Sequence, residues 1–330
     1  MTSQRRRSLT RSQLRRSLAA LVVLCGLALA GLYAVSGTYG LNVLLRRGWS
    51  LWVGVSLDDP RLSDSMRSAL RDQSGPAVAG PFAWQTIAQG FEVAELPVIS
   101  DGGEVDRILL ARIDPARFRF VVRNAPSGDR ELADWMKALG AALVINGSYF
   151  SPQGTPDTPI VSAGVRSGPQ DYQARHGAFV ASSATVTIHD LGKEDWRVAL
   201  GKAEDAMVSY PLLVAEDRSN HVTADPHWLA NRSFVAVDDR GMIVVGTTKE
   251  AFFSLDRFAT FLRDAPLGLK TALNLDGGPV ACQGIALNDF RRAFCGSWEL
   301  TAGDGRLKLL QPAFVKGRWA MPIVLAVLPK

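Results

Sequence analysis

Hydrophobic residues follow two patterns along the chain: one long apolar run near the N-terminus and many short runs after residue 82. Residues 18–35 carry no charge, and a helix rising ~1.5 Å per residue covers roughly 27 Å over that length, close to the ~30 Å hydrocarbon core of a bilayer. Arginines flank the run: Arg5, Arg6, Arg7, Arg11, Arg15 and Arg16 precede it, and Arg46 and Arg47 follow it. This excess orients the N-terminal end toward the cytoplasm and predicts that the rest of the chain lies outside.

The N-terminal segment has two interpretations. In the first, residues 1–17 form a basic cytoplasmic tail and residues 18–35 a retained transmembrane anchor, so that the lipid bilayer is a partner of the chain. In the second, the segment is a cleaved signal peptide, because Ala28-Leu29-Ala30 fits a cleavage site. The uncharged stretch reaches Leu45, which favours the anchor. Both place the main domain in an extracytoplasmic space, and the arginine-rich leader is typical of a single-pass protein of the bacterial inner membrane with a periplasmic domain, or of a secreted one.

Short apolar runs predict a domain with more strands than helices over residues 82–330. Strands are expected at 84–88, 91–96, 108–113, 118–122, 143–145, 178–180, 186–188, 234–237, 243–245, 272–275 and 323–327. Helical spacing is best at 131–139 and 255–262. Residues 36–81 are expected to form a linker with a short helix that starts near Asp58-Asp59-Pro60. The prediction is an α+β fold: a single mixed, β-sheet-rich domain with a few flanking helices, preceded by one N-terminal transmembrane helix.

One internal similarity concerns residues 139–148 and 267–278. Each segment follows an amphipathic helix and reads Leu-Gly, a buried strand, and then Asn or Asp with Gly. Glycine supplies the left-handed cap of a helix, and a continuous apolar strand implies cover on both faces. The two copies indicate a pseudo-two-fold domain whose strand ends converge, although a repeat this short also arises by chance.

Charge and cysteine content narrow the function classes. The formal charge of +5 depends on the eight arginines of residues 1–47, and the remaining chain has 29 Lys and Arg against 32 Asp and Glu. A net negative domain has no bulk electrostatic reason to bind nucleic acid.

Of the three cysteines, Cys25 lies in the apolar run, whereas Cys282 and Cys295 would both lie in an oxidising space. They are disulfide candidates that would close a loop of about 14 residues, and two separate buried thiols are the alternative.

Candidate chemistry gathers where predicted strands end. Asp276 follows an apolar strand and precedes Gly277 and Gly278, which let a ligand or a backbone amide approach closely; the alternative is an ordinary Asp-Gly turn. Asn146 and Ser148 end the other repeated strand, with a plain strand end as the alternative. Arg232 stands before a predicted strand, where its guanidinium could hold a phosphate, although an isolated arginine is more often a surface residue. Weaker candidates are Asn274, Asp157 and His176.

Three common catalytic motifs do not occur in the sequence. It contains no Gly-x-Ser-x-Gly elbow, no phosphate-binding loop of the Gly-x-x-x-x-Gly-Lys type and no His-Glu-x-x-His pair. No metal site or cofactor is therefore expected. Carboxylates, an arginine and glycine-rich strand ends suit the handling of sugars and phosphates better than acyl transfer.

Several ordered motifs resemble the phosphodiester glycosidase family, which includes the "uncovering enzyme" of animals. Residues 145–150 (Ile-Asn-Gly-Ser-Tyr-Phe) and 274–279 (Asn-Leu-Asp-Gly-Gly-Pro) resemble its two signature blocks. Four further segments resemble parts of the family pattern in the same order. They are the domain opening at 84–90, the Pro-Leu-Val segment at 211–214, the arginine before a strand at 231–233 and the closing strand at 321–324. Ser148, Tyr149 and the residues after Gly278 depart from the usual pattern, so substrate contacts need not be shared.

The resemblance implies a hydrolase that cleaves the glycosidic bond of a sugar phosphodiester. It casts Asp276 as the group that stabilises or attacks the anomeric carbon, Asp157 as a reserve acid or base, and Arg232 as the phosphate ligand. Asn146, Ser148 and the amides of Gly277 and Gly278 would orient the ligand. Two other functions stay open: a membrane-tethered module that binds a glycan or phosphoglycan without catalysis, and a metal-dependent phosphodiesterase that cuts the P–O bond.

Overall fold

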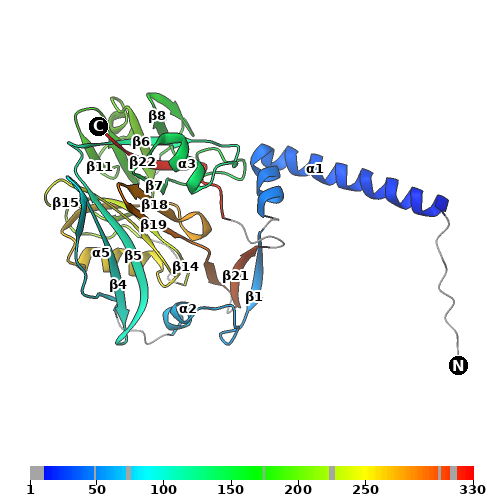
Figure 1. The fold of residues 1–330 in the computed structure, drawn as a ribbon, viewed down its shortest axis with the longest axis horizontal. Coiled ribbons are helices and arrows are strands. Elements are labelled where there is room, and N and C mark those ends of the chain that lie inside the picture. The colour runs from blue at the N-terminus through cyan, green and yellow to red at the C-terminus, as the bar shows by residue number, and fades with distance from the viewer. Residues whose placement is uncertain are drawn as a thin grey trace.

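A computed structural model describes residues 11–47, 50–71, 76–173, 175–222, 227–303, 306–312 and 318–330. The arginines at positions 5, 6 and 7, most of the expected cytoplasmic tail and part of the expected linker fall outside these residues. In the described part, β-strands predominate and five α-helices accompany them, four of which belong to the strand-rich body in Figure 1. The predicted β-rich α+β class is confirmed.

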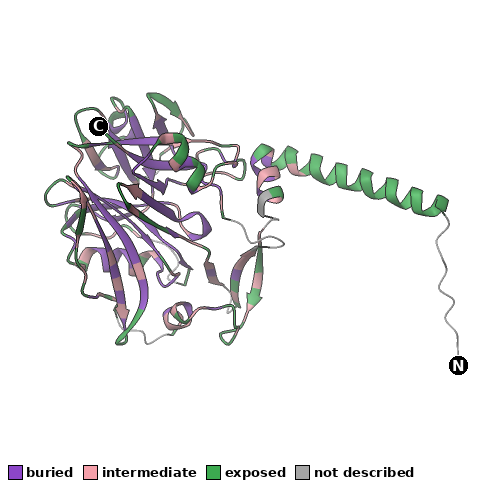
Figure 2. Cartoon of the chain, in the orientation of Figure 1, coloured by how far each residue is buried: buried purple, intermediate pink, exposed green. Residues whose placement is uncertain are grey.

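The N-terminal helix α1 (Arg11–Arg47) projects away from the strand-rich body (Figure 1). Of the helices in the described ranges, it is the one long and apolar enough to cross a membrane. Its large apolar side chains are exposed between Leu14 and Val35, as the outer part of the helix in Figure 2 illustrates. Exposed leucines and valines in such number are stable next to lipid rather than water. The helix bends at Gly37, whose φ of 58° is non-helical.

In the described ranges the strands form four sheets, and their pairings are antiparallel. The largest has the order β13 (Leu212–Val214), β17 (Leu269–Asn274), β15 (Ser233–Asp238), β16 (Ile243–Thr248), β5 (Gly103–Ile113), β4 (Phe91–Ser100) and β2 (Val78–Ala79), with β3 (Gln85–Ala88) also paired to β4. A second has the order β19 (Phe290–Cys295), β18 (Cys282–Leu287), β7 (Leu143–Asn146), β22 (Ile323–Pro329) and β6 (Phe118–Asn124).

Two further sheets complete the β structure. One has the order β11 (Val186–Asp190), β10 (Gly177–Ala181), β12 (Asp205–Ser209), β8 (Ile160–Ser162) and β9 (Val165–Ser167). The other has the order β1 (Ser50–Val55), β21 (Arg306–Pro312), β20 (Glu299–Gly303) and β14 (Leu229–Ala230). The last sheet joins β1, the strand that follows α1, to β14 and β20.

Continuous apolar strands arise because the central sheets are covered on both faces. In β5, Leu109 and Ala111 belong to one core cluster and Ile108 and Leu110 to another, so successive side chains enter opposite cores. The same alternation occurs in β7, where Val144 separates Leu143 and Ile145. Each strand is therefore fixed in register, since a slip by one residue would exchange the two cores.

The short helices cover the outer faces of these sheets. They are α2 (Asp64–Ala69), α3 (Leu132–Leu139), α4 (Trp196–Ala199) and α5 (Leu255–Asp264). The predicted helices at 131–139 and 255–262 correspond to α3 and α5. The helix expected from Asp58 begins later, at Asp64, because the hydroxyl of Ser63 caps it by accepting a hydrogen bond from the Met66 amide at 3.2 Å. Residues 57–60 form turns instead.

Segments that the sequence assigned to a linker pack against the domain. Leu62, Met66 and Ala69 of the α2 region lie in the same buried cluster as Leu96 and Phe258. In addition, β1 pairs along its whole length with β21. The domain boundary at residue 82 stays a prediction, but the preceding residues contribute both a helix and strands to the folded body.

Both copies of the repeated unit adopt the expected local structure. Helix α3 ends at Gly140, with φ of 58°, before β7, and α5 is followed by Gly268, with φ of 65°, before β17. These positive φ values need glycine because a Cβ would be strained there. In the structure Cys282 and Cys295 lie opposite each other on β18 and β19 and are joined by a disulfide bond.

Candidate active site

The ends of the two repeated strands, β7 and β17, meet. Asn146, the last residue of β7, donates a hydrogen bond from Nδ2 to the carbonyl oxygen of Asp276 at 2.7 Å. The Asp276 amide in turn donates to the carbonyl oxygen of Gly147 at 3.0 Å. The buried Asn146 side chain also accepts from the Cys282 amide at 3.1 Å. Asn146 therefore joins three chain segments and fixes the position of Asp276.

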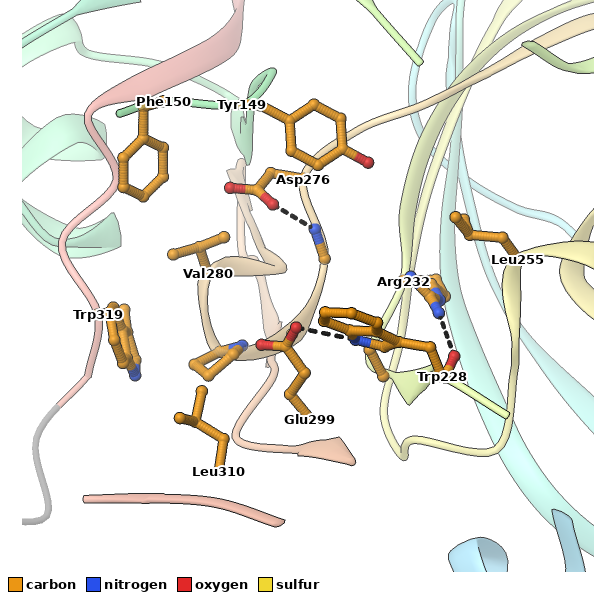
Figure 3. A pocket seen from close by; sticks show the side chains of 14 residues that line it. Tyr149, Phe150, Trp228, Arg232, Leu255, Asp276, Val280, Glu299, Leu310 and Trp319 are labelled. Carbon is orange, nitrogen blue, oxygen red and sulfur yellow. Dashed lines mark hydrogen bonds between the residues drawn. The ribbon is translucent and has the colours of Figure 1, made fainter. Parts of the chain in front are cut away.

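Asp276 lies in a pocket of about 320 Å³. Figure 3 shows its carboxyl group between Tyr149 and Val280. Its Oδ1 accepts a hydrogen bond from the Gly277 amide at 2.9 Å. The surrounding protein raises the pKa of Asp276 well above its usual range, mainly by excluding water and further through the charges of Glu299 and Asp157. A carboxyl group in this setting is suited to proton transfer or to the stabilisation of a cation.

Glu299 is a second carboxyl group in the same pocket, and no sequence motif pointed to it. Its Oε1 accepts a hydrogen bond from the indole nitrogen of Trp228 at 2.9 Å (Figure 3). Burial raises the pKa of Glu299, while the Trp228 hydrogen bond and the charge of Arg232 oppose that shift. Asp276 and Glu299 thus form a pair of acidic groups whose ionisation is mutually unfavourable.

Arg232 lines the pocket and is buried, with 5% of its surface exposed. Its Nε donates to the Phe253 carbonyl at 3.2 Å and its Nη2 to the Trp228 carbonyl at 2.7 Å. Nη1 is turned toward Gly277, 3.3 Å from where a Cβ on that glycine would stand. Burial lowers the pKa of Arg232 to about 10, so the guanidinium keeps its charge at neutral pH. Nη1 is thus the guanidinium nitrogen next to Gly277, a residue that also lines the pocket.

Asp157 and His176 lie outside the pocket wall. Asp157 is exposed and its pKa is raised by partial desolvation, yet it is near enough for its charge to raise the pKa of Asp276. His176 stacks on Tyr210 with ring centroids 4.5 Å apart, and Tyr210 stacks on Tyr149 at 4.1 Å. Burial lowers the pKa of His176. The aromatic stack connects His176 to the pocket only through Tyr149.

Other predicted ligand-binding groups are engaged within the protein. Ser148 is buried and its hydroxyl bonds to that of Thr158 at 2.9 Å. Asn274 donates to the Tyr149 hydroxyl at 2.8 Å and so orients that ring. The amides of Gly277 and Gly278 were expected to bind ligand, but they donate to the Asp276 carboxyl group and to the Asn231 carbonyl. In this arrangement these groups shape the pocket rather than offering donors to it.

Two glycines allow the close contacts around Asp276. A Cβ on Gly278 would stand 2.6 Å from Oε2 of Glu299, and its φ is 65°. A Cβ on Gly277 would stand 3.0 Å from the Asn231 carbonyl oxygen. The Asp-Gly-Gly sequence therefore does more than form a turn, because it brings a second carboxyl group beside the first.

The described residues show no cluster of potential metal ligands. Within the residues that the structure describes, no three His, Cys, Asp or Glu side chains gather in a way that could hold a metal ion. A larger hollow of about 890 Å³ near residues 114–120 and 182–186 contains none of the predicted site residues. The pocket at Asp276 is consequently the better candidate for chemistry.

Comparison with protein families finds one similar family. Residues 130–281 match the phosphodiester glycosidases. This confirms the resemblance that the sequence motifs indicated. All nine predicted catalytic and binding residues lie within the phosphodiester glycosidase segment, whereas Glu299 lies beyond it. No curated protein is significantly similar to the whole chain.

Solved structures resemble this chain to different degrees. The catalytic domain of zebrafish N-acetylglucosamine-1-phosphodiester alpha-N-acetylglucosaminidase, auto-inhibited by its pro-peptide, matches with a TM-score of 0.50 and 14% identity, over 85% of this chain and 88% of that one. A hypothetical protein from Synechocystis gives 0.47 and 16%, over 76% and 64%. A putative exported protein from Burkholderia pseudomallei gives 0.38 and 11%, over 71% and 77%. At 14% identity the first likeness shows a common fold, and the family match and fold together suggest phosphodiester glycosidase activity.

Proposed function

We propose that the protein hydrolyses the glycosidic bond of a sugar phosphodiester in the bacterial cell envelope. Water would add to the anomeric carbon as the bond from that carbon to the phosphate oxygen breaks. The products would be a free sugar, a phosphomonoester and a proton. The observation that carries the proposal is the pairing of Asp276 and Glu299 in one pocket with Arg232.

Each of these groups suits a separate requirement of the reaction. The transition state resembles a sugar cation, which a carboxylate at Asp276 would stabilise or attack. The leaving phosphate is already a weak base, so it needs little proton donation, and the Arg232 guanidinium would balance its growing negative charge. Glu299 would then accept the proton of the attacking water. Asp157 is close enough to influence the titration of Asp276 and remains a reserve acid or base.

The envelope location rests on α1 and the charge pattern around it. We infer that the helix is a signal anchor that holds the domain on the outer side of the inner membrane, with a cleaved signal peptide as the other outcome of processing. Measuring the intact mass of the mature protein distinguishes them, since cleavage would remove about 30 residues.

Hydrolysis of a defined substrate in ¹⁸O-labelled water tests the proposed reaction. The full chain in detergent would be given the methyl phosphodiester of N-acetylglucosamine 1-phosphate and related sugars, with products followed by phosphorus NMR and mass spectrometry. Cleavage at the anomeric carbon places ¹⁸O in the sugar, whereas a phosphodiesterase cutting the P–O bond places it in the phosphate.

Asp276→Asn provides the matched variant for this assay. It should lower kcat by roughly 10³-fold or more with the fold retained, because the amide is nearly isosteric but cannot carry the charge. Asp239→Asn, outside the pocket, should keep wild-type turnover. Full activity of Asp276→Asn would remove this aspartate from the mechanism, and saturable binding without turnover by the wild type would identify a glycan-binding module instead.

A further inference from the structure

The floor of the pocket belongs to a sheet that begins at the membrane anchor. In the four-stranded sheet, Ala230 of β14 pairs with Glu299 of β20. Leu300 pairs with Leu309, so the same antiparallel register sets Glu299 beside Leu310 of β21. Leu310 in turn pairs with Trp52 of β1. Residues paired across antiparallel strands share one face, which places Ala230, Glu299, Leu310 and Trp52 in a single row.

Polarity changes along this row. Its inner members Ala230 and Glu299 line the pocket, as does Leu310. At its outer end Trp52 is 43% exposed, and its ring meets that of Trp228 edge to face with centroids 6.2 Å apart. Trp228 is itself 40% exposed and holds Glu299 by a hydrogen bond. An exposed apolar track thus leads directly from the carboxyl pair to the edge of the sheet.

Apolar side chains also form the wall on the other side of the pocket. Figure 3 shows Phe150, Val280 and Trp319 along one side of the site. A phosphate and a sugar supply polar groups, and these would be matched by Arg232 and the two carboxyl groups. This wall is mostly apolar, so the remainder of the ligand is expected to be mostly apolar.

The anchor contacts the rim of this pocket at a second place. After the bend at Gly37, Tyr39 is buried and its ring lies edge to face with Phe150, centroids 5.5 Å apart. Asn42 Nδ2 donates to the Ser127 carbonyl at 2.7 Å. A Cβ on Gly154 would stand 2.9 Å from the Tyr39 ring, so only a glycine fits there. The membrane end of the domain and the pocket rim are therefore one packed unit.

We propose that the alcohol carried by the substrate phosphate is a lipid chain, and that the pocket takes this lipid-linked sugar phosphodiester from the bilayer that holds α1. This inference rests on the proposed function. The chain would lie along Leu310, Trp52 and Trp228, with the sugar phosphate at Asp276, Glu299 and Arg232. The anchor would then act as a positioning element, because it presents the mouth of the pocket to the membrane surface.

Comparison of two substrates with one head group tests the assignment. The full chain, reconstituted in phosphatidylethanolamine and phosphatidylglycerol vesicles, would be assayed with the methyl and the octadecyl phosphodiester of the same sugar 1-phosphate. Burying several methylene groups should raise kcat/KM for the octadecyl ester by roughly tenfold or more. Trp52→Ser should remove most of that gain and leave the methyl ester within about twofold of wild type, because Trp52 lies beyond the carboxyl pair.

Two controls separate a local effect from a general one. Trp52→Phe should retain the preference, since it keeps an apolar ring, and Val165→Ser alters an exposed apolar residue of β9 and should change neither substrate. Equal kcat/KM for the two esters in the wild type, or an equal loss for both in Trp52→Ser, would overturn the lipid assignment while the proposed hydrolysis stands. Failure of the wild type to hydrolyse either ester would overturn the proposed function and this inference with it.

Discussion

Glu299 illustrates at the residue scale why a single side chain can escape sequence analysis. It stands at the start of a short strand, without a motif around it and outside the segment that matches the phosphodiester glycosidases. Its place next to Asp276 comes from the pairing of β20 with β14 and from the absence of a side chain on Gly278. These are contacts between residues distant in sequence, which no local pattern encodes.

The pH dependence of the reaction should report on this residue. If both carboxyl groups act ionised, kcat/KM rises with pH through an apparent pKa above the usual carboxyl range, because burial raises the pKa of each. Glu299→Gln should lower kcat/KM by roughly 10²-fold to 10⁴-fold through loss of the base. The rise of kcat/KM with pH that remains in this variant should also occur at lower pH, since the charge of Glu299 no longer raises the pKa of Asp276.

A pH–rate profile of each variant with the methyl phosphodiester measures both effects. Glu216→Gln, an exposed change outside the pocket, serves as the comparison and should leave the profile in place. A Glu299→Gln profile that coincides with that of the wild type would show that Glu299 takes no part in the proton transfer.

At the scale of single elements, short apolar runs were the signal from which the sequence predicted strands. Each of the eleven predicted strands overlaps a strand of the structure. Several of them, such as β5 and β15, are buried on both faces, whereas β3 is partly exposed. Strands interrupted by polar or glycine residues were missed. Examples are β1, β20 and β21, whose sheet has a partly exposed face. In this sheet β1 pairs with β21 and β14 with β20 over long distances in sequence.

Part of the candidate site could be predicted because its residues follow predicted strands. Asn146 and Asp276 were found because each follows a buried strand, and their hydrogen bond shows that the strand ends converge. What each polar group contacts could not be read from the sequence. The hydroxyl of Ser148 turns to Thr158, and the Gly277 amide turns to Asp276, because backbone geometry after the strand decides where these groups point.

The connection between the two strand ends should be measurable as stability. Asn146→Ala would leave the Asp276 carbonyl and the Cys282 amide without their buried partner, at a cost of about 1–3 kcal/mol for each group. Urea denaturation in one detergent should therefore show a free energy of unfolding lower by roughly 2–5 kcal/mol. Asn220→Ala, which removes an exposed hydrogen bond to Asp256, should change it by less than about 0.5 kcal/mol. Equal effects of the two substitutions would mean that Asn146 does not couple the strands.

At the scale of the whole molecule, the pocket holds several ionisable side chains whose burial is unfavourable for folding. Asp276 and Glu299 are partly withdrawn from water in the folded chain, and Arg232 is buried beside them. Their arrangement favours a ligand that is cationic at one atom and anionic at the next, which describes a sugar cation leaving a phosphate. The same arrangement implies that the empty pocket lowers the stability of the fold at neutral pH.

This cost should appear as a pH-dependent gain in the Asp276→Asn variant. Because the pKa of Asp276 is raised in the folded state, the stability linked to its proton is complete below the unfolded value near 3.8 and is lost as the pH rises through the folded value. Asn imitates the protonated form at every pH. Urea denaturation without ligand should thus show that the advantage of Asp276→Asn over wild type grows as the pH rises from about 4.

Asp59→Asn supplies a control of opposite sign. Hydrogen bonds from Arg61 lower the pKa of Asp59 to about 2, so its ionised form favours folding above the unfolded value and that contribution is lost as the pH falls toward 2. Asp59→Asn should therefore be less stable than wild type at neutral pH, with the deficit shrinking in acid, and the effect should be small because the pair is exposed. A stability difference for Asp276→Asn that stays constant between pH 4 and pH 8 would contradict a buried, destabilising carboxyl group at the centre of the pocket.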